Sequence, residues 1–243
     1  MNKIKLSLVI PCYNEEKNIP LVVDKIKEHV NRSDLEFILV DNGSKDNTRK
    51  EIQKYAKKYS AIKLVKIDKN IGYGNGIYQG LKAAKGEYIG WTHADLQTNP
   101  YDAIRALEII EKSNYPNDLY VKGKRYGRPI TDTLVNTWGM SIFETLVLGK
   151  PLFDINAQPN IFHKSLLENK KDEQIPKDFA FDLYIYYLAK VKKFKVKRFP
   201  VYFGKRIFGE SAWNTGWKAR IKFIKRTINF TFGLKKKLKN EKL

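Results

Sequence analysis

Short apolar runs alternate along the first half of the chain with segments in which apolar residues recur every three or four positions. The runs cover residues 6–10, 37–40, 62–67, 88–91 and 119–121, and their starts lie 31, 25, 26 and 31 residues apart. This spacing accommodates a strand, a loop, a helix and a second loop. Residues 17–30 and 46–59 show the helical spacing between runs. The pattern predicts an α/β fold with a Rossmann-like, mainly parallel sheet flanked by helices, in which ligands bind at the carboxyl ends of the strands.

The second half of the chain is less regular. The pattern predicts an amphipathic helix over residues 133–148, an apolar helix over 179–191 and a strand over 195–203. No linker or internal repeat separates these segments from the first half, so we expect one catalytic domain over residues 1–215. Over residues 217–238, apolar residues fall mostly at helical spacing among Lys and Arg, which predicts a basic amphipathic helix in a C-terminal extension at 216–243.

The charge of the chain is unusual for a protein of ordinary hydrophobic content. Its 243 residues include 46 Lys or Arg against 26 Asp or Glu, a net charge of +20. Such an excess attracts phosphate-rich partners, which include nucleic acid, anionic lipid and nucleotides. Composition alone does not choose among the three.

The basic extension favours an anionic membrane surface as one partner. Residues 216–243 contain ten Lys or Arg and one Glu, and therefore supply +9 of the +20. A helix of this kind lies naturally in a lipid interface, although a helix packed on the domain with a solvated cationic face has the same pattern. Nucleic-acid binding is the rival interpretation, because the same charge would meet a phosphate backbone. No recognised nucleic-acid-binding module is visible, so we expect no nucleic-acid partner.

Cysteine content and hydropathy indicate the compartment. Cys12 is the single cysteine, which permits no intramolecular disulfide and fits a reducing environment. The apolar run at the N-terminus is too short for a signal peptide, and no stretch approaches the roughly 20 apolar residues needed to cross a bilayer. We therefore expect a cytoplasmic protein whose association with the membrane is peripheral.

Polar or glycine-rich loops follow the first three predicted strands. Residues 11–16 read PCYNEE and residues 41–48 read DNGSKDNT. A carboxylate at a strand tip, such as that of Asp41, can accept hydrogen bonds from a base or a ribose hydroxyl. Residues 70–76 read NIGYGNG, and its glycines let the backbone approach a ligand closely. This loop lacks the Gly-Lys-Ser/Thr ending of a phosphate-binding P-loop.

The fourth strand delivers a candidate metal site. His93, Asp95 and Gln97 alternate by two positions, so in an extended backbone their side chains share one face. Oxygen ligands from Asp95 and Gln97, with few other protein donors, suit Mg²⁺ or Mn²⁺ whose remaining positions are filled by substrate phosphates. The sequence therefore predicts a divalent cation as cofactor.

The four loops, taken in order, resemble a known family. The segments VIPCYNEE, VDNGSKDNT, NIGYGNG and HADLQ resemble the N-terminal half of family 2 glycosyltransferases, nearest to the dolichyl or polyprenyl phosphate mannose and glucose synthases. The likeness extends more loosely to GKR at 123–125, DINAQP at 154–159 and RIFGES at 206–211. It implies a GT-A fold and an enzyme that moves a hexose from a UDP- or GDP-linked sugar to a membrane-associated acceptor, for which polyprenyl phosphate is the leading candidate.

The resemblance also implies site residues. Arg125 and Arg206 would meet phosphate charge, the task that guanidinium geometry suits, and Arg206 would act with Asp95 in catalysis. The metal under the diphosphate would be held by Asp95 and Gln97. The other positions expected to bind substrate are Pro11, Tyr13, Glu15, Asp41, Gly72, Gly74, His93 and Ser211.

Two departures from the family pattern affect these expectations. His93 stands where the metal motif usually begins with Asp; an imidazole can coordinate a metal or bond to a sugar, but it lacks the negative charge that attracts a cation. Residues 156–162 read NAQPNIF, where the synthases typically carry Ser-Gly-Phe-Arg. The acceptor is therefore open between a lipid phosphate and a saccharide hydroxyl in cell-surface glycan assembly. Transfer to a hydroxyl needs a general base, for which Asp182 is the best candidate, whereas an ionised phosphate needs none.

Overall fold

A single mixed sheet organises the protein. The computed structural model describes residues 3–130, 133–209 and 217–240, and within them the sheet has seven strands in the order β3-β2-β1-β4-β6-β5-β7. The strands are β1 (Leu6–Cys12), β2 (Leu35–Asn42), β3 (Ile62–Ile67), β4 (Tyr88–Trp91), β5 (Leu119–Tyr126), β6 (Asn160–His163) and β7 (Lys195–Tyr202). Neighbouring pairs are parallel, except that β6 runs antiparallel to both β4 and β5. The first four strands are thus the βαβ succession that the apolar runs predict.

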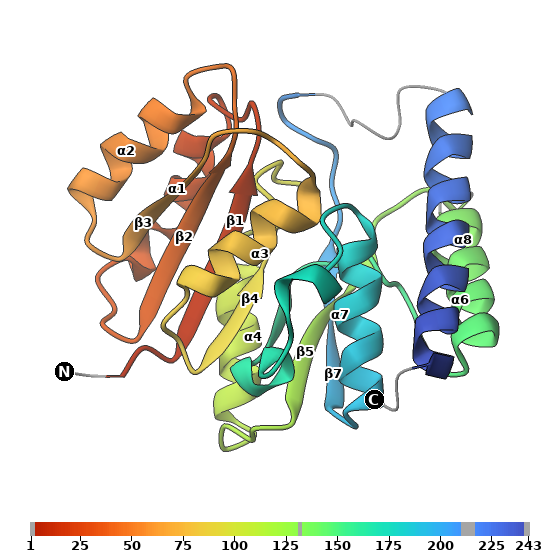
Figure 1. Ribbon diagram of the computed structural model, residues 1–243. Coiled ribbons are helices and arrows are strands. Elements are labelled where there is room, and N and C mark those ends of the chain that lie inside the picture. Colours follow the sequence, from red (N-terminus) through yellow and green to blue (C-terminus); the bar gives the residue numbers. More distant parts are fainter. Residues whose placement is uncertain (1–2, 131–132, 210–216, 241–243) are drawn as a thin grey trace.

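Helices cover both faces of this sheet (Figure 1). The helices of the βαβ units are α1 (Ile19–Ile26), α2 (Thr48–Lys58), α3 (Tyr73–Ala83) and α4 (Asp102–Glu111); a short helix η1 (Lys27–His29) follows α1. In the second half lie η2 (Thr133–Gly139), α6 (Met140–Leu148), η3 (Lys164–Leu167), η4 (Asp172–Gln174), α7 (Ala180–Val191) and α8 (Trp217–Asn240). One apolar cluster joins the sheet to α1, α2 and α4, and a second joins it to α3 and α7.

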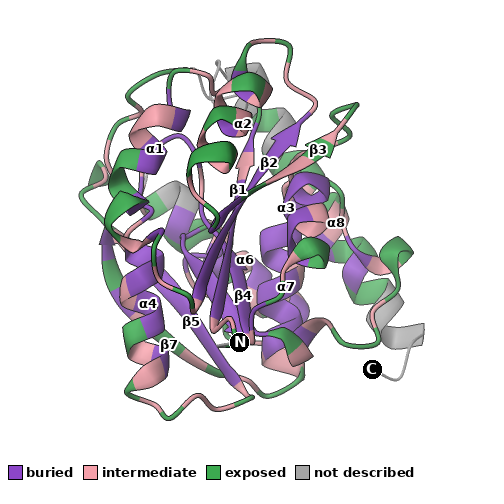
Figure 2. Ribbon diagram, turned by 90° about the vertical axis from the view of Figure 1, so that its left-hand side faces the viewer, coloured by how far each residue is buried: buried purple, intermediate pink, exposed green. Residues whose placement is uncertain are grey.

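Burial on both faces explains the continuous apolar runs of the central strands. All eight residues of β2 are buried, and six of the seven in β1. In β1, Leu8 and Ile10 pack into the first cluster, whereas Val9 between them packs into the second. Strands sandwiched in this way carry nearly continuous hydrophobic runs instead of alternating. Figure 2 shows the result as a buried sheet between helices whose outer sides are exposed.

Most of the predicted elements are confirmed. Strands β3 and β4 have the predicted bounds, and β1, β2 and β5 are longer than their apolar runs. The helix expected over residues 133–148 begins as the π-helical η2 and continues as α6. Strand β6 was not predicted, because its four residues are polar at both ends and contain only two apolar positions.

Helix α8 packs on α6 beside the rest of the molecule (Figure 1). Leu234 is buried in the second apolar cluster and Phe230 packs against that cluster. Glu144 of α6 is fully buried at this contact, and both of its carboxylate oxygens lie within 2.9 Å of Thr231 Oγ1 of α8. That hydroxyl also lies 2.8 Å from the carbonyl oxygen of Thr227. The one hydroxyl proton serves either acceptor, and a protonated Glu144 satisfies both by donating to Thr231 while Thr231 donates to Thr227.

This contact makes stability depend on pH. Burial raises the pKa of Glu144 from its usual 4.5 to about 7. A carboxyl with a raised pKa contributes stability that is complete below its unfolded pKa and is lost as the pH rises through the folded one. We predict that, between about pH 4 and about pH 8, the free energy of unfolding of the wild type falls by about 3 kcal/mol relative to that of Glu144→Gln.

Urea unfolding of both proteins across this range measures the difference. Gln keeps the size of the side chain and donates to Thr231 at every pH, so its own curve lacks this component. Parallel curves for the two proteins would show that folding leaves the pKa of Glu144 unchanged and that the contact does not depend on its proton.

Candidate active site

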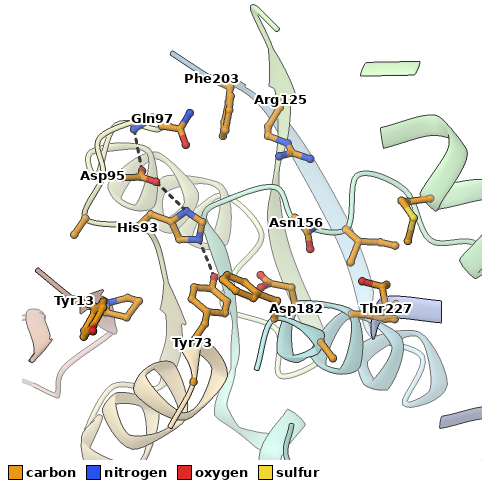
Figure 3. Close-up of a pocket in the computed structure, with 18 of the residues that line it drawn as sticks. Tyr13, Tyr73, His93, Asp95, Gln97, Arg125, Asn156, Asp182, Phe203 and Thr227 are labelled. Carbon is orange, nitrogen blue, oxygen red and sulfur yellow. Dashed lines mark hydrogen bonds and ion pairs between the residues drawn. The ribbon is translucent and has the colours of Figure 1, made fainter. Parts of the chain in front are cut away.

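A cavity of about 500 Å³ lies at the carboxyl ends of β1 and β4 (Figure 3). The loops after β1 and β4 form one side, the first turns of α3 and α7 form the floor, and α6 and α8 form the far wall. Parallel strands bring their carboxyl ends to one edge of a sheet, and ligands bind there. The position is the one that the loop sequences predict.

Most of the predicted site residues meet in this cavity. Asp41 and Gly74 do not line it, and Ser211 lies outside the residues that the structure describes. The predicted residues that do line it are Pro11, Tyr13, Glu15, Gly72, His93, Asp95, Gln97, Arg125, Asp182 and Arg206. Segments separated by almost 200 residues in the chain therefore converge on one space.

Asp41 is fully buried, and its carboxylate serves the fold. Oδ1 accepts a hydrogen bond from the backbone N–H of Ser44 at 3.0 Å, and Oδ2 pairs with Arg49 Nε at 2.5 Å. The first contact closes the turn after β2 and the second ties β2 to α2. The expected contact of Asp41 with a base or ribose stays a prediction, and it needs this carboxylate to give up a partner.

The two glycines are needed for packing. Gly72 has φ +139°, and a Cβ there would lie 2.1 Å from the carbonyl oxygen of Lys177. A Cβ on Gly74 would lie 2.7 Å from Phe181 Cβ and nearer still to the carbonyl oxygen of Pro176. Both positions therefore let the start of α3 pack against the segment that leads into α7. The close backbone approach expected of this loop is made to protein, with Gly72 also facing the cavity.

The segment after β4 is a turn instead of the extended strand that the alternation of His93, Asp95 and Gln97 suggested. Strand β4 ends at Trp91, and Leu96 has φ +58°. Asp95 Oδ1 accepts the backbone N–H of Gln97 at 3.1 Å, which holds the turn. The expectation of an extended backbone was wrong, yet the turn still directs all three side chains to the cavity (Figure 3).

Asp95 is the centre of charge in this turn. Its side chain is almost fully buried, and Oδ2 pairs with Arg206 Nη2 at 2.8 Å. His93 Nδ1 lies 3.9 Å from the same oxygen. Gln97 Nε2 donates to the carbonyl oxygen of Gly204 at 3.2 Å, so its amide oxygen is the atom that can face a cation.

These residues fit a divalent cation in part. A carboxylate and an amide oxygen are hard ligands of the kind that Mg²⁺ and Mn²⁺ prefer. Within the described part of the chain, no three His, Cys, Asp or Glu side chains gather as a ready-made metal site. Asp95 and Gln97 are therefore a partial ligand set, and Arg206 holds the charge of Asp95 in this state.

Glu15 and Tyr13 form the opposite lip of the cavity. The backbone N–H of Glu15 donates to Thr48 Oγ1 at 2.7 Å, and its carboxylate accepts from Asn18. Burial, with a smaller effect of the Asp95 charge, raises the pKa of Glu15. Tyr13 is exposed and offers a ring face at the cavity edge. An exposed ring of this kind can stack on a base, and the partly buried carboxyl beside it can accept a hydrogen bond from a hydroxyl.

Arg125 lines the cavity but already has a partner. Its Nε donates to Asp154 Oδ1 at 2.8 Å, and its backbone N–H donates to Oδ2 at 2.9 Å. Burial pushes the pKa of Asp154 upward, but the Arg125 guanidinium outweighs it and the net pKa is lowered. This buried pair holds β5 to the loop before β6. Contact of Arg125 with phosphate stays a prediction.

The sequence interpretation missed two residues, Tyr73 in the cavity wall and the buried Gln158 behind it. The Tyr73 hydroxyl lies 2.8 Å from His93 Nε2 and 3.4 Å from Gln158 Nε2, and burial raises its pKa well above 10. Gln158 Nε2 also donates to Asp182 Oδ1 at 2.8 Å. Tyr73 lies within the glycine-rich loop, where attention to the glycines hid it, and Gln158 was noted only as a departure from a motif.

Asp182 is buried at the floor of the cavity. Burial raises its pKa, and the charges of Lys122 and His93 together with the Gln158 hydrogen bond oppose this rise. A carboxyl with a raised pKa that remains at a ligand cavity is suited to accept a proton. The structure thus places the sequence's candidate base where a hydroxyl could reach it.

Comparison with known proteins supports the family resemblance that the loop sequences indicate. A family model described as Glycosyl transferase family 2 matches residues 7–169. A dolichyl-phosphate beta-glucosyltransferase from Dictyostelium discoideum is 29% identical over 207 residues, which cover 78% of this chain and 63% of that protein. The enzyme of the same name from Homo sapiens is 26% identical over 217 residues, covering 81% and 66%. The chain thus spans about two thirds of the length of these relatives.

Solved structures share the fold. Glucosyl-3-phosphoglycerate synthase from Mycobacterium tuberculosis superposes with a TM-score of 0.68 at 16% identity, covering 96% of this chain and 80% of that one. A mannosyltransferase from Pyrobaculum calidifontis gives 0.61 at 20% identity, covering 87% and 59%. At these identities the likeness concerns the fold alone, and it is the GT-A fold that the sequence resemblance implies. Because the family match spans more than half of a chain with this fold and this cavity, the protein belongs to glycosyl transferase family 2.

Proposed function

We propose that this protein transfers a hexose from a nucleotide diphosphate sugar to a polyprenyl phosphate at a membrane surface. The observation that carries the proposal is the single cavity in which the loops after β1 and β4 meet Asp182 and Arg206. Membership of the family supports glycosyl transfer, and the names of the relatives support a dolichyl-type phosphate as acceptor and glucose as the sugar. Since the chain spans about two thirds of those relatives, both substrates are proposals.

The donor is expected to lie along the sheet edge from Tyr13 to Asp95. The ring of Tyr13 and the carboxyl of Glu15 suit the nucleoside, and the diphosphate then reaches Asp95, Gln97 and Arg206. The solved mannosyltransferase carries GDP-mannose and Mn²⁺ in its crystal, which supports a divalent cation in this fold. When bound, such a cation would offset the charge that develops on the departing diphosphate.

Arg206 can exchange partners when the diphosphate arrives. In this state it neutralises Asp95 across 2.8 Å, and a quarter of its side chain is exposed to solvent in the cavity. A guanidinium binds phosphate oxygens as readily as a carboxylate. Movement of Arg206 onto the diphosphate would free Asp95 Oδ2 for the cation, so a single displacement prepares both contacts.

The acceptor decides the role of Asp182. A polyprenyl phosphate attacks the anomeric carbon with an oxygen that is already ionised, so it needs no base. A saccharide hydroxyl must instead lose a proton, and the raised pKa of the buried Asp182 suits that task. Transfer to a saccharide in glycan assembly is therefore the second candidate function, and Asp182 is the observation in its favour. In either case the family resemblance implies in-line attack with inversion.

We predict that the purified protein with Mn²⁺ and UDP-glucose or GDP-mannose transfers the sugar to a short polyprenyl phosphate in liposomes. Asp95→Asn keeps the size of the side chain and removes its charge, so kcat should fall at least about 100-fold. Asp118→Asn is the matched control, because Asp118 is an exposed carboxylate paired with Lys195 far from the cavity. Radiolabelled sugar in the lipid fraction is the readout.

Three other results of the transfer assay would change the proposal in different ways. Transfer to an oligosaccharide but not to lipid would support the second function, and that activity should then require Asp182. Full activity of Asp95→Asn would contradict the proposed cation site. No transfer with any donor, together with tight salt-sensitive binding to RNA or DNA, would overturn the enzyme assignment.

The proposed membrane surface is the outer side of η2, α6 and α8. Large apolar side chains at intervals of four, Leu134, Trp138, Ile142 and Leu146, are each at least half exposed there. Ile221 and Phe232 of α8 are exposed as well. The rings of Phe143 and Phe232 lie 6.1 Å apart, so α6 and α8 are in contact at this part of the molecule. Apolar side chains gathered in this way on a protein surface indicate an interaction site.

Charge and position favour a lipid surface as the occupant. Lys225, Lys235 and Lys236 of α8 are exposed, which suits an anionic interface. The same helix pair lines the cavity with Met140, Glu144 and Thr227, so a bilayer against its outer side would place lipid next to the site. Within the described residues, no helix is long and apolar enough to cross a membrane.

We predict that the double variant Ile142→Ser, Leu146→Ser lowers the partition coefficient onto anionic liposomes at least about tenfold. The reason is that two aliphatic side chains that the bilayer would bury are lost from the interface. Ile71→Ser is the control, since Ile71 is an equally exposed apolar residue on another part of the molecule. Liposome flotation measures binding. Unchanged binding in the double variant would contradict this surface. Deleting α8 is a poorer test, because Leu234 and Thr231 are buried against the domain.

A further inference from the structure

Lys122 is a fully buried cation in the middle of β5 that the proposed reaction does not use directly. Its Nζ donates to the carbonyl oxygens of Ile155 and Ala157 at 2.6 and 2.7 Å, and to Asn160 Oδ1 at 2.7 Å. Three acceptors match the three N–H groups of an ammonium, although burial and the nearby Arg198 charge lower the pKa of Lys122. A buried cation with a complete set of acceptors is a fixed donor.

Asn160, on the neighbouring strand β6, accepts one of the hydrogen bonds that Lys122 donates. The antiparallel pairing of β5 and β6 sets Lys122 directly across from Asn160. Asn160 Oδ1 also accepts the hydroxyl of Tyr120 at 2.8 Å, while its Nδ2 donates to Gln158 Oε1 at 2.6 Å. Because Lys122 can only donate, the amide of Asn160 must turn its oxygen toward β5 and its nitrogen toward Gln158.

The orientation of Asn160 in turn fixes the orientation of Gln158, which contacts Asp182. Gln158 uses Oε1 to accept from Asn160, so its Nε2 must face the other way, where it donates to Asp182 Oδ1 at 2.8 Å. If either amide turned over, two acceptors or two donors would face each other without water to separate them, which is strongly unfavourable in a buried site. The direction of the whole chain is therefore set at its Lys122 end.

We propose that Lys122 is a positioning residue for Asp182: as the donor-only end of a buried hydrogen-bond chain through Asn160 and Gln158, it fixes the carboxylate as an acceptor at the cavity floor. Lys122 also pins the loop that carries Gln158, through the carbonyls of Ile155 and Ala157. The chain stands on geometry alone, whereas the part of Asp182 in the reaction rests on transfer to a saccharide hydroxyl, the second function proposed above.

The charges around Asp182 make the inference measurable. Lys122 faces it from β5, His93 from the loop after β4 and Tyr73 from α3. Removing Lys122 removes a positive charge and leaves the two amides free to turn, and both changes favour the protonated carboxyl. The loss therefore acts on Asp182 without changing any group that contacts it.

The test is a ¹³C NMR titration of the aspartate carboxyl carbons, with the Asp182 signal assigned from Asp182→Asn. In Lys122→Met the titration midpoint of Asp182 should rise by at least about one pH unit. Lys124→Met is the matched control: it removes the same charge two residues along β5, where the side chain is exposed, and should leave the midpoint unchanged. Equal midpoints in Lys122→Met and the wild type, or equal shifts in both Lys variants, would overturn the inference.

A second variant covers the case in which Lys122→Met fails to fold. Asn160→Asp retains an acceptor for Lys122 and Tyr120 but has no N–H for Gln158, and the midpoint of Asp182 should again rise. An unchanged midpoint there would also overturn the inference. In a transfer assay with a saccharide acceptor, for which Asp182 is the candidate base, kcat of Lys122→Met should fall at least about tenfold with an unchanged KM for the nucleotide sugar. If the wild type shows no transfer, the proposed function fails while the titration still decides the role of Lys122.

Discussion

The burial of ionisable side chains beneath the cavity is the constraint on which the rest of this structure depends. Asp95, Asp154 and Asp182 are almost completely buried, and Lys122 is entirely so. An isolated charge in such a place costs several kcal/mol, so each must have a partner within hydrogen-bond distance. Those partners come from elements far apart in the chain, and the need to bring them together shapes the second half of the fold.

The ion pairs differ in how easily they can change. Arg125 and Asp154 are both buried, and breaking this pair would leave a charge without water. Arg206 is partly open to the cavity and can leave Asp95 for a ligand that brings charge of its own. The first pair therefore holds the loop before β6 in place, while the second can respond to substrate.

The sequence predicted the parallel half of the sheet well, because burial on both faces leaves an apolar run that needs no tertiary information. It also predicted which loops meet, since parallel strands end at one edge. Strand β6 escaped prediction because it is short and its reversed direction depends on its neighbours β4 and β5. The pairing of Asp41 with Arg49 and of Arg125 with Asp154 could not be read from spacing, because each depends on the exact approach of two elements.

A crystal structure with UDP and Mn²⁺ tests most directly whether Asp95 lies under the diphosphate of a nucleotide sugar. Anomalous scattering locates the manganese without reference to the protein. We expect a manganese peak between the Asp95 carboxylate and the diphosphate, with Arg206 moved from Asp95 onto a phosphate oxygen. A diphosphate bound away from Asp95, or manganese held elsewhere while the pair between Arg206 and Asp95 stays intact, would contradict it.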